Sequence, residues 1–191
     1  MTKEFEIWKS HLKEVVKNNS FNYSPEANFK LVCGEMSRFY FDCKRTTLRA
    51  DGQFFIGNMI YELIKNDKVQ AIGGLTLGAD AIATAVAHTS FQHYNPIHAM
   101  IVRKAVKDHG TKKRIEGMVY PPKKTNVVVV DDVITTGGST IEAIEVFKEA
   151  GYTVTKAVVL VDRGEMNGRE NVLKHVPEVI SLFTAEEFIQ F

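Results

Sequence analysis

The stretch that decides the fold is Thr125–Ile144, which reads TNVVVVDDVITTGGSTIEAI. Its run of β-branched residues, Val127–Val130, is typical of a parallel strand that is covered by helices on both faces. The two carboxylates that follow, Asp131 and Asp132, are expected at the carboxyl end of this strand. Ligands bind at that end in open α/β sheets, so the pair marks a candidate site.

The turn after the carboxylates has the composition of an anion site. It consists of Thr135, Thr136, Gly137, Gly138, Ser139 and Thr140. Ser139 and Glu142 have the spacing of a capping box, which predicts that a helix begins here. Backbone N–H groups at such a turn and the helix dipole favour a phosphate, while paired carboxylates bind hydroxyl groups or a metal ion. A phosphorylated sugar with Mg²⁺ satisfies both halves of the stretch. The alternative is a plain turn, because these residue types also favour turns for conformational reasons.

Composition limits the class of protein. The 191 residues are 45% hydrophobic, enough for the core of one α/β domain spanning 1–191, and the net charge of +1 gives no global field for nucleic acid or membranes. Cys33 and Cys43 are not at zinc-binding spacing. We therefore expect reduced thiols in a cytoplasmic protein, and no apolar run is long enough to cross a membrane.

Hydrophobic periodicity predicts a doubly wound parallel sheet of about five strands in a core of residues 49–191, preceded by a small hood of residues 1–48. The hood contains an amphipathic helix ending near Asn18 and Asn19 and two short strands, Phe29–Cys33 and Arg38–Asp42. The core strands are expected at Val69–Ile72, Ile97–Val102, Val127–Val130, Val154–Val161 and Val179–Phe183. The core helices are expected from Asp51 to about Lys65 and at Ala81–Thr89, Ile141–Ala150, Asn167–Leu173 and Thr184–Phe191.

Two loops after core strands have unusual composition. Gly73–Asp80 contains three glycines, which permit close approach of the backbone to a ligand but also occur in sharp turns. Arg103–Lys124 carries eight Lys or Arg residues against two acidic ones, a local excess of six positive charges. Such a run is either a solvated surface loop or a lid that covers a polyanion.

Val127–Thr140 resembles the signature of the type I phosphoribosyltransferases, which bind 5-phosphoribosyl 1-diphosphate (PRPP). Three further segments resemble the orotate phosphoribosyltransferases of that class: Ser37–Phe41, Gly74–Asp80 and Arg103–Gly110. The resemblance implies a Mg²⁺-dependent transfer of the phosphoribosyl group of PRPP to orotate, giving orotidine 5′-monophosphate and diphosphate in pyrimidine biosynthesis. It also implies a homodimer whose lid loop is shared between subunits.

The resemblance assigns a role to each matched residue. Asp131, Asp132, Lys107 and His109 would be catalytic. The 5′-phosphate of PRPP would be bound by Thr135, Thr136, Gly137, Gly138, Ser139 and Thr140. The diphosphate would be bound by Thr76, Leu77, Gly78, Arg103, Lys104, Lys107 and His109. Orotate would be bound by Tyr40, Phe41, Thr135 and Arg163. Mg²⁺ would be held mainly by PRPP oxygens and water. For Arg163 the residues alone leave a second interpretation, a surface arginine paired with Asp162 or Glu165.

The chain departs from the family pattern at two places. Val32 stands where many orotate enzymes have a lysine, and Leu77-Gly78 stands where some have another, so either Lys30 or Lys44 substitutes or the substrate site differs. Two other functions therefore stay open: a phosphoribosyltransferase for another base, such as a purine, and a PRPP-sensing regulator that binds nucleic acid through Arg103–Lys124. The near-neutral charge disfavours the regulator, and we expect neither nucleic acid nor a membrane as a partner.

Overall fold

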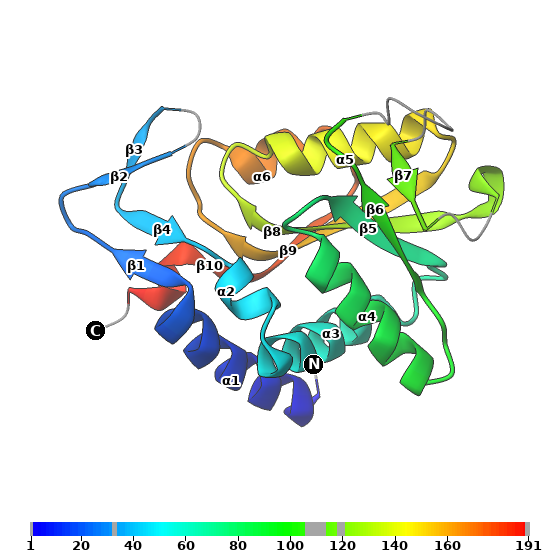
Figure 1. Ribbon diagram of the computed structural model, residues 1–191, viewed down its shortest axis with the longest axis horizontal. Coiled ribbons are helices and arrows are strands. Elements are labelled where there is room, and N and C mark those ends of the chain that lie inside the picture. Colours follow the sequence, from blue (N-terminus) through cyan, green and yellow to red (C-terminus); the bar gives the residue numbers. More distant parts are fainter. Residues whose placement is uncertain (1, 32–33, 106–113, 118–120, 190–191) are drawn as a thin grey trace.

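The computed structural model describes residues 2–31, 34–105, 114–117 and 121–189. Its main element is a six-stranded sheet with the strand order β10-β9-β8-β5-β6-β7 (Figure 1). The strands are β5 (Ala71–Leu75), β6 (His98–Val102), β7 (Ile115–Glu116), β8 (Asn126–Ile134), β9 (Thr153–Asp162) and β10 (Val179–Thr184). All neighbouring strands are parallel except β7, which pairs antiparallel with β6 at the edge. The predicted fold class is confirmed, and within this sheet β7 is the strand that the sequence pattern did not predict.

Helices cover both faces of this sheet (Figure 1). The helical elements are α1 (Lys3–Asn19), α2 (Lys44–Thr47), α3 (Ala50–Ile64), α4 (Asp80–Gln92), α5 (Gly138–Glu149) and α6 (Gly168–Leu173), with 3₁₀ turns η1 (Pro122–Lys124) and η2 (Ala185–Phe188). One core cluster joins α1, α3 and α4 to Val128 and Val130, and a second joins α5 and α6 to Val127 and Val129. Alternate residues of β8 thus enter opposite cores, which explains why its sequence is continuously apolar.

The connections place a crevice between β5 and β8. From β5 the chain passes to β6 on one side, then returns to β8 on the other side and continues to β9 and β10. This reversal separates the loops that follow β5 and β8, which is where ligands bind in open α/β sheets.

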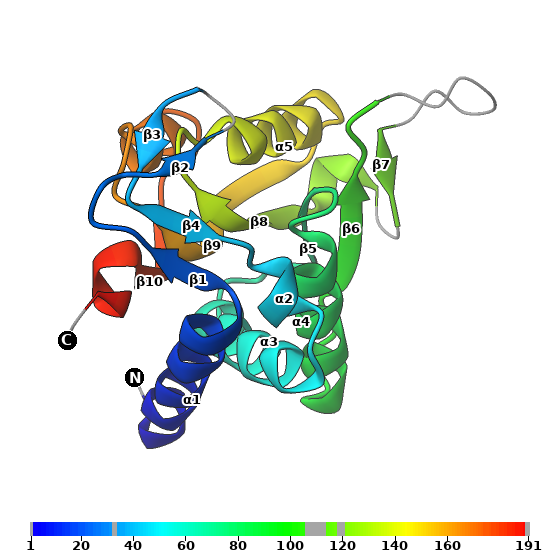
Figure 2. The same ribbon diagram turned by 60° about the vertical axis from the view of Figure 1, so that its left-hand side comes forward.

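The hood consists of two small antiparallel sheets beside this crevice (Figure 2). In one of them β1 (Phe21–Tyr23) pairs with β4 (Phe39–Phe41), and in the other β2 (Phe29–Lys30) pairs with β3 (Met36–Ser37). The two expected hood strands therefore exist outside the main sheet but belong to different sheets. Helix α1 ends at Asn19 as predicted, and its apolar residues join the core beneath the main sheet.

Several predicted boundaries are wrong. Asp51 does not begin α3, because Arg49 occupies the extended N-cap position and its guanidinium binds the Asp51 carboxylate. Strand β5 begins and ends later than expected, so that it includes Gly73 and Gly74. Thr184 and Glu187 form a capping box, but among the described residues the helix expected at Thr184–Phe191 is only the short η2.

Gly73 and Gly74 are required by the packing of the sheet. A Cβ at Gly73 would lie 2.1 Å from the carbonyl oxygen of Met100, and one at Gly74 would lie 2.0 Å from that of Val130. Because backbone atoms of neighbouring strands fill this space, only glycine fits at these two positions.

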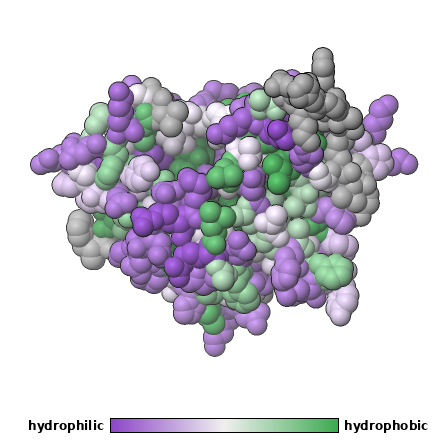
Figure 3. All heavy atoms as spheres, viewed as in Figure 1, coloured by the Kyte–Doolittle hydropathy of each residue, from purple (hydrophilic) through white to green (hydrophobic). Residues whose placement is uncertain are grey.

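The surface is mixed in character. Figure 3 shows hydrophilic residues over most of one face, with hydrophobic residues scattered near its centre. Among the described residues, no helix is long and apolar enough to cross a membrane.

Candidate active site

A hollow of about 750 Å³, here called the main cleft, lies at the crevice between β5 and β8. It is lined by Lys44, Leu75, Thr76, Leu77, Gly78, Lys104, Asp131, Asp132, Val133, Thr135, Thr136, Gly137, Gly138 and Ser139. These residues come from α2, the loop after β5, the end of β6, and β8 with the turn that follows it. The main cleft therefore brings together Asp131, Asp132 and most of the residues that are expected to bind the 5′-phosphate and the diphosphate.

Asp131 and Asp132 lie within β8, three and two residues before its end, because the strand continues to Ile134. Asp131 is 4% exposed, and its Oδ2 atom accepts hydrogen bonds from Ser139 Oγ at 2.6 Å and Thr140 Oγ1 at 2.8 Å. Asp132 is less buried, and its Oδ1 accepts from the backbone N–H of Val133 at 3.0 Å. Asp131 is thus held in place by the turn.

Burial makes both carboxylates hard to ionise. Burial, with a smaller contribution from the neighbouring Asp132, raises the pKa of Asp131 to about 7, although the hydroxyl groups of Ser139 and Thr140 act to lower it. Burial also raises the pKa of Asp132, and the positive charge of Lys44 counteracts that rise. A positive charge placed between the carboxylates would therefore be strongly favoured.

The hydroxyl turn is built differently from the predicted capping box. Gly137, with φ +85°, occupies the N-cap position of α5, and no side chain caps this helix. The hydroxyl of Ser139 is bonded to Asp131, and Glu142 pairs with Arg114, so neither is available to form the box. Gly137, Gly138 and Ser139, at the start of α5, line the main cleft. Because the first N–H groups of a helix have no partner within the helix, this end of α5 is a candidate anion site.

Thr140 is 1% exposed and its hydroxyl donates a hydrogen bond to Asp131. Thr140 does not line the main cleft. The opposite wall is the loop after β5, in which the Thr76–Leu77 peptide is cis and the Thr76 hydroxyl donates to Asp80 at 2.8 Å. A Cβ at Gly78 would lie 2.6 Å from Asp132 Oδ1 and 3.1 Å from Asp131 Oδ1. Gly78 is therefore the glycine of this loop that brings backbone against the carboxylates.

A second hollow of about 390 Å³, here called the side cavity, adjoins the main cleft. It is lined by Lys30, Leu31, Tyr40, Phe41, Asp132, Val133, Thr135, Thr136 and Arg163. Tyr40 is 45% exposed and its ring lies 5.7 Å from that of Phe29, whereas the ring of Phe41 also packs on Phe21 and Phe188. The side cavity thus has aromatic groups from the hood on one side and polar groups from β8 on the other.

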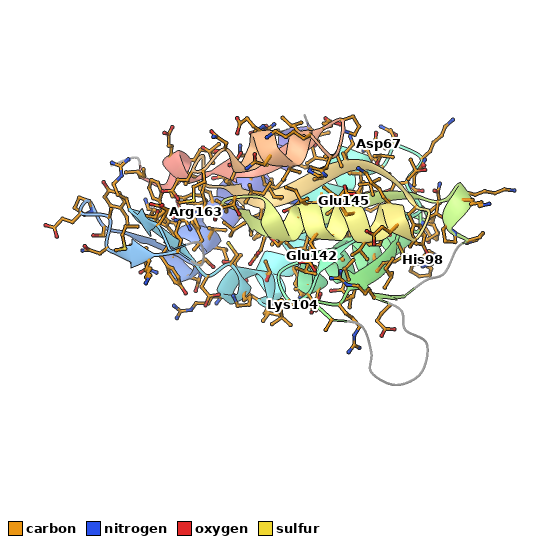
Figure 4. The ribbon with its side chains drawn as sticks, turned by 90° about the horizontal axis from the view of Figure 1, so that it is seen from above. Asp67, His98, Lys104, Glu142, Glu145 and Arg163 are labelled. Carbon is orange, nitrogen blue, oxygen red and sulfur yellow. The ribbon has the colours of Figure 1, made fainter. Side chains whose placement is uncertain are left out.

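Arg163 follows β9 and is 6% exposed, so the interpretation as a surface arginine is wrong. It does pair with Glu165, at 3.0 Å, whereas Asp162 lies 3.7 Å from Arg169. Viewed from above, Arg163 lies beside the hood, and Lys104 lies farther along the molecule, on the side toward β6 (Figure 4).

The remaining candidates are dispersed. Arg103 lines a neighbouring hollow outside the main cleft, where its guanidinium lies 3.4 Å from Glu116. Lys107, His109 and Val32 lie outside the described residues. Of the two substitute lysines, Lys44 lines the main cleft and Lys30 the side cavity.

Sequence reasoning missed the supports of these residues. It did not assign Ser37, which contacts Arg163, or the use of Ser139 and Thr140 by Asp131. It named Glu165 only as a partner of Arg163 at the surface, whereas the pair is buried beside the hood. No local pattern could have found Ser37, because it contacts Arg163 across 126 positions of sequence.

Comparison with known proteins agrees with this geometry. Residues 56–190 match the model of the phosphoribosyl transferase domain family. The chain is 41% identical over 181 residues to the orotate phosphoribosyltransferase of Aquifex aeolicus (strain VF5), covering 95% of this chain and 97% of that protein. It is 42% identical to the orotate phosphoribosyltransferase of Leptospira biflexa serovar Patoc, and the match covers 85% of this chain and 88% of that protein.

Solved structures show the same likeness. The crystal structure of Mycobacterium tuberculosis orotate phosphoribosyltransferase with Fe(III) dicitrate superposes with a TM-score of 0.79 at 30% identity, covering 96% of this chain and 99% of that one. The complex of the M. tuberculosis enzyme with PRPP superposes with a TM-score of 0.74 at 27% identity, covering 95% and 92%.

The sheet order, the carboxylate pair and the family match define the class: the chain belongs to the phosphoribosyltransferases. Within that class its relatives place it among the orotate phosphoribosyltransferases, the pentosyltransferases that join the phosphoribosyl group of PRPP to orotate in pyrimidine biosynthesis. The purine-base and regulator alternatives are therefore set aside.

Proposed function

We propose that the reaction is divided between the two hollows, with PRPP in the main cleft and orotate in the side cavity. One observation carries this division: the hollows share Asp132, Val133, Thr135 and Thr136 along their common wall. A ribose bound at the shared wall would present its C1 atom to a base in the side cavity. Holding two reactants in this arrangement accounts for a large part of the acceleration in such transfers.

The main cleft offers a partner for each part of PRPP. The N–H groups at the start of α5 and the hydroxyls of Thr135 and Thr136 would bind the 5′-phosphate. Asp131 and Asp132 would bind the ribose hydroxyls. Among the described residues, Thr76, Leu77, Gly78 and Lys104 would bind the diphosphate.

The chemistry requires no nucleophile from the protein. As the bond from C1 to the diphosphate oxygen breaks, positive charge develops on the ribose ring. Orotate N1 forms the new bond to C1 and gives up its proton, which the departing diphosphate or water can accept. Carboxylates that are buried and preorganised beside the ring stabilise this charge more in the transition state than in the ground state. Cationic groups near the diphosphate stabilise the departing negative charge. We propose this role for Lys104 and Arg103, and on sequence resemblance alone for Lys107 and His109.

Mg²⁺ fits the donor set of the main cleft. The described residues contain no group of three or more His, Cys, Asp or Glu side chains placed to hold a metal. The oxygens of Asp132, Thr135 and Thr136 are of the hard type that Mg²⁺ prefers, and the ion commonly keeps several waters and binds substrate phosphates. We propose that bound Mg²⁺ would neutralise diphosphate charge, with these side chains orienting its waters.

The side cavity fits a planar acid. Tyr40 and Phe41 supply aromatic surface for stacking on a pyrimidine ring, and the Arg163 guanidinium can pair with the orotate carboxylate. Thr135, on the shared wall, can bond a ring oxygen.

We also propose a homodimer in which the basic loop is shared between subunits. Phe54 on α3 is 56% exposed and Phe91 on α4 is 74% exposed, and Phe54 lines a groove of about 510 Å³ between these helices. Exposed aromatic residues of this kind are enriched at subunit interfaces. Light scattering should show a dimer for the native protein and a monomer for Phe54→Glu, with Ile7→Glu on the exposed face of α1 as the control. A monomeric native protein would overturn this part of the proposal.

We further propose that the chain acts as one domain, in the cytoplasm. The shared core of α1, α3 and the main sheet supports the first statement, because the hood helix would lose its apolar partners if separated. The second rests on composition alone.

The division between hollows is tested with one assay. Loss of orotate absorbance is followed with PRPP and Mg²⁺, beside uracil, adenine, guanine and hypoxanthine, and with PRPP or metal omitted. Asp132→Asn should lower kcat about 10²- to 10³-fold while the KM for orotate changes little, because the carboxylate acts on the ribose. An Asp132→Asn enzyme with native kcat would contradict the placement of ribose at the shared wall.

A further inference from the structure

The guanidinium of Arg163 is held by the hood. Its Nη2 atom donates to Ser37 Oγ at 2.6 Å and to the carbonyl oxygen of Phe39 at 2.6 Å. Ser37 is 2% exposed and its hydroxyl also accepts from the backbone N–H of Phe39 at 3.0 Å. An arginine at the end of β9 is therefore fastened to β3 and β4, which are more than 120 residues earlier in the chain.

Glu165 completes this cluster. Its Oε1 atom accepts from Ser37 Oγ at 2.7 Å, and its Oε2 atom lies 3.0 Å from Arg163 Nε. The second contact is an ion pair that is not aligned as a hydrogen bond. One carboxylate thus contacts both the arginine and the hydroxyl that holds it, forming a closed triangle of Ser37, Glu165 and Arg163.

We propose that Glu165 is a positioning residue, which fixes the Arg163 guanidinium for recognition of the carboxylate of the base. The inference rests on the proposed function of Arg163 as the group that binds this carboxylate. An arginine side chain has many rotamers, and its binding to a planar carboxylate depends on orientation. A side chain that is already ordered loses less conformational entropy when the ligand binds, so the triangle strengthens recognition without touching the substrate.

A purely structural role for the triangle makes a different prediction. Arg163 is buried, and an arginine deprived of its carboxylate partner would destabilise the fold and weaken every ligand of the side cavity to a similar extent. Positioning instead affects only ligands that carry the carboxylate. The two roles are separated by a pair of ligands that differ in this group alone.

Orotidine 5′-monophosphate and uridine 5′-monophosphate are such a pair, because both have the ribose and the phosphate and only the first has the carboxylate. The dissociation constants of both are measured by calorimetry for the native protein, Glu165→Gln and Ser37→Ala. Glu165→Gln should weaken binding of orotidine 5′-monophosphate about tenfold, the effect expected when one charge-assisted contact is lost. Binding of uridine 5′-monophosphate should change less than about twofold. Ser37→Ala should shift the ratio of the two constants in the same direction.

Two further variants make the outcome decisive. Glu170→Gln is the matched control, because Glu170 is exposed on the neighbouring α6, and it should leave the ratio unchanged. Glu165→Asp keeps the negative charge, so the ratio of the two dissociation constants should lie between that of Glu165→Gln and that of the native protein. Equal weakening of both nucleotides, or a lower melting temperature with a native ratio, would overturn the positioning role.

The variant Arg163→Gln tests separately whether Arg163 binds the carboxylate of the base. If this variant loses the preference for orotidine 5′-monophosphate while Glu165→Gln keeps it, Arg163 binds the carboxylate and the inference about Glu165 is wrong. If Arg163→Gln keeps the preference, another group binds the carboxylate, and the assignment of Arg163 and the inference fall together.

Discussion

Ser139 donates a hydrogen bond to Asp131, with 2.6 Å between Oγ and Oδ2. Ser139 belongs to the first turn of α5, where we place the phosphate, and Asp131 belongs to β8, where we place the ribose. The bond therefore joins the proposed phosphate site to the proposed ribose site. Because it also lowers the pKa of Asp131, it helps to keep that carboxylate ionised.

Ser139→Ala tests this link. Removal of the hydroxyl should raise the pKa of Asp131 further, so the acidic limb of the pH profile of kcat/KM for PRPP should move to higher pH. Thr140→Val, which removes the second hydroxyl donor, should shift the limb in the same direction. Ser10→Ala, on the exposed face of α1, is the control. An unshifted limb in both Ser139→Ala and Thr140→Val would show that Asp131 does not set it.

The raised pKa of Asp131 also predicts how stability depends on pH. Its ordinary value is 3.8 and its folded value is about 7, so the folded protein holds this proton more tightly than the unfolded chain does. The stabilisation from this group is full below about pH 4 and is lost as the pH rises through about 7. Position 131 does not titrate in Asp131→Asn. The melting temperature of this variant minus that of the native protein should therefore increase as the pH rises from about 4 to about 7, by at least roughly 2–4 °C, which corresponds to about 1 kcal/mol. A pH-independent difference would contradict the shift.

Lys44 is expected to contribute positive charge to the main cleft. Its ammonium lies 2.7 Å from Asp42 Oδ1, an ion pair that raises the pKa of Lys44. Lys44→Gln should raise the KM for PRPP about tenfold, because a polyanion loses a nearby cation. It should also raise the pKa of Asp132, which Lys44 lowers. Arg45→Gln, at the next position but outside the main cleft, is the control and should behave as the native protein. Identical kinetics for Lys44→Gln and Arg45→Gln would show that Lys44 does not bind PRPP.

Substitution of Gly78 by alanine should lower activity, whereas substitution of Gly74 by alanine should lower stability. In Gly78→Ala the new Cβ meets Asp132 Oδ1, a side-chain atom, so kcat should fall by about tenfold or more while the melting temperature changes little. In Gly74→Ala the Cβ meets the carbonyl oxygen of Val130, so the sheet itself must shift and the protein should lose several kcal/mol of stability, on the order of that for an overpacked core. Comparing activity and thermal melting for the pair checks both statements, and equal loss of stability in both variants would refute the distinction.

Local patterns in the sequence were enough to predict the class of fold. The continuous apolar run of β8 predicted a strand buried on both faces, and the helical periodicity of the first segment predicted the end of α1 at Asn19. Both succeed because burial and periodicity are properties of consecutive residues. The order of strand, carboxylates and hydroxyl turn likewise predicted the PRPP class, since one βα unit carries all three.

The same local reasoning failed where a distant group competes for a side chain. The box of Ser139 and Glu142 has the correct spacing, but Asp131 binds the serine and Arg114 binds the glutamate. Spacing shows which hydrogen bonds are sterically possible, and the folded environment decides which partner is bound.

The sequence by itself therefore determined the doubly wound sheet, the position of the carboxylate pair and the family. Only the tertiary structure decided that Arg163 is buried against the hood, that Ser37 and Glu165 hold it, and that Lys44 borders the main cleft. The physical reason is the range of the interactions. Strands and helices follow from backbone bonding and burial along a few residues, whereas Ser37 meets Arg163 only because β3 and the end of β9 are brought together by the packing of the whole chain.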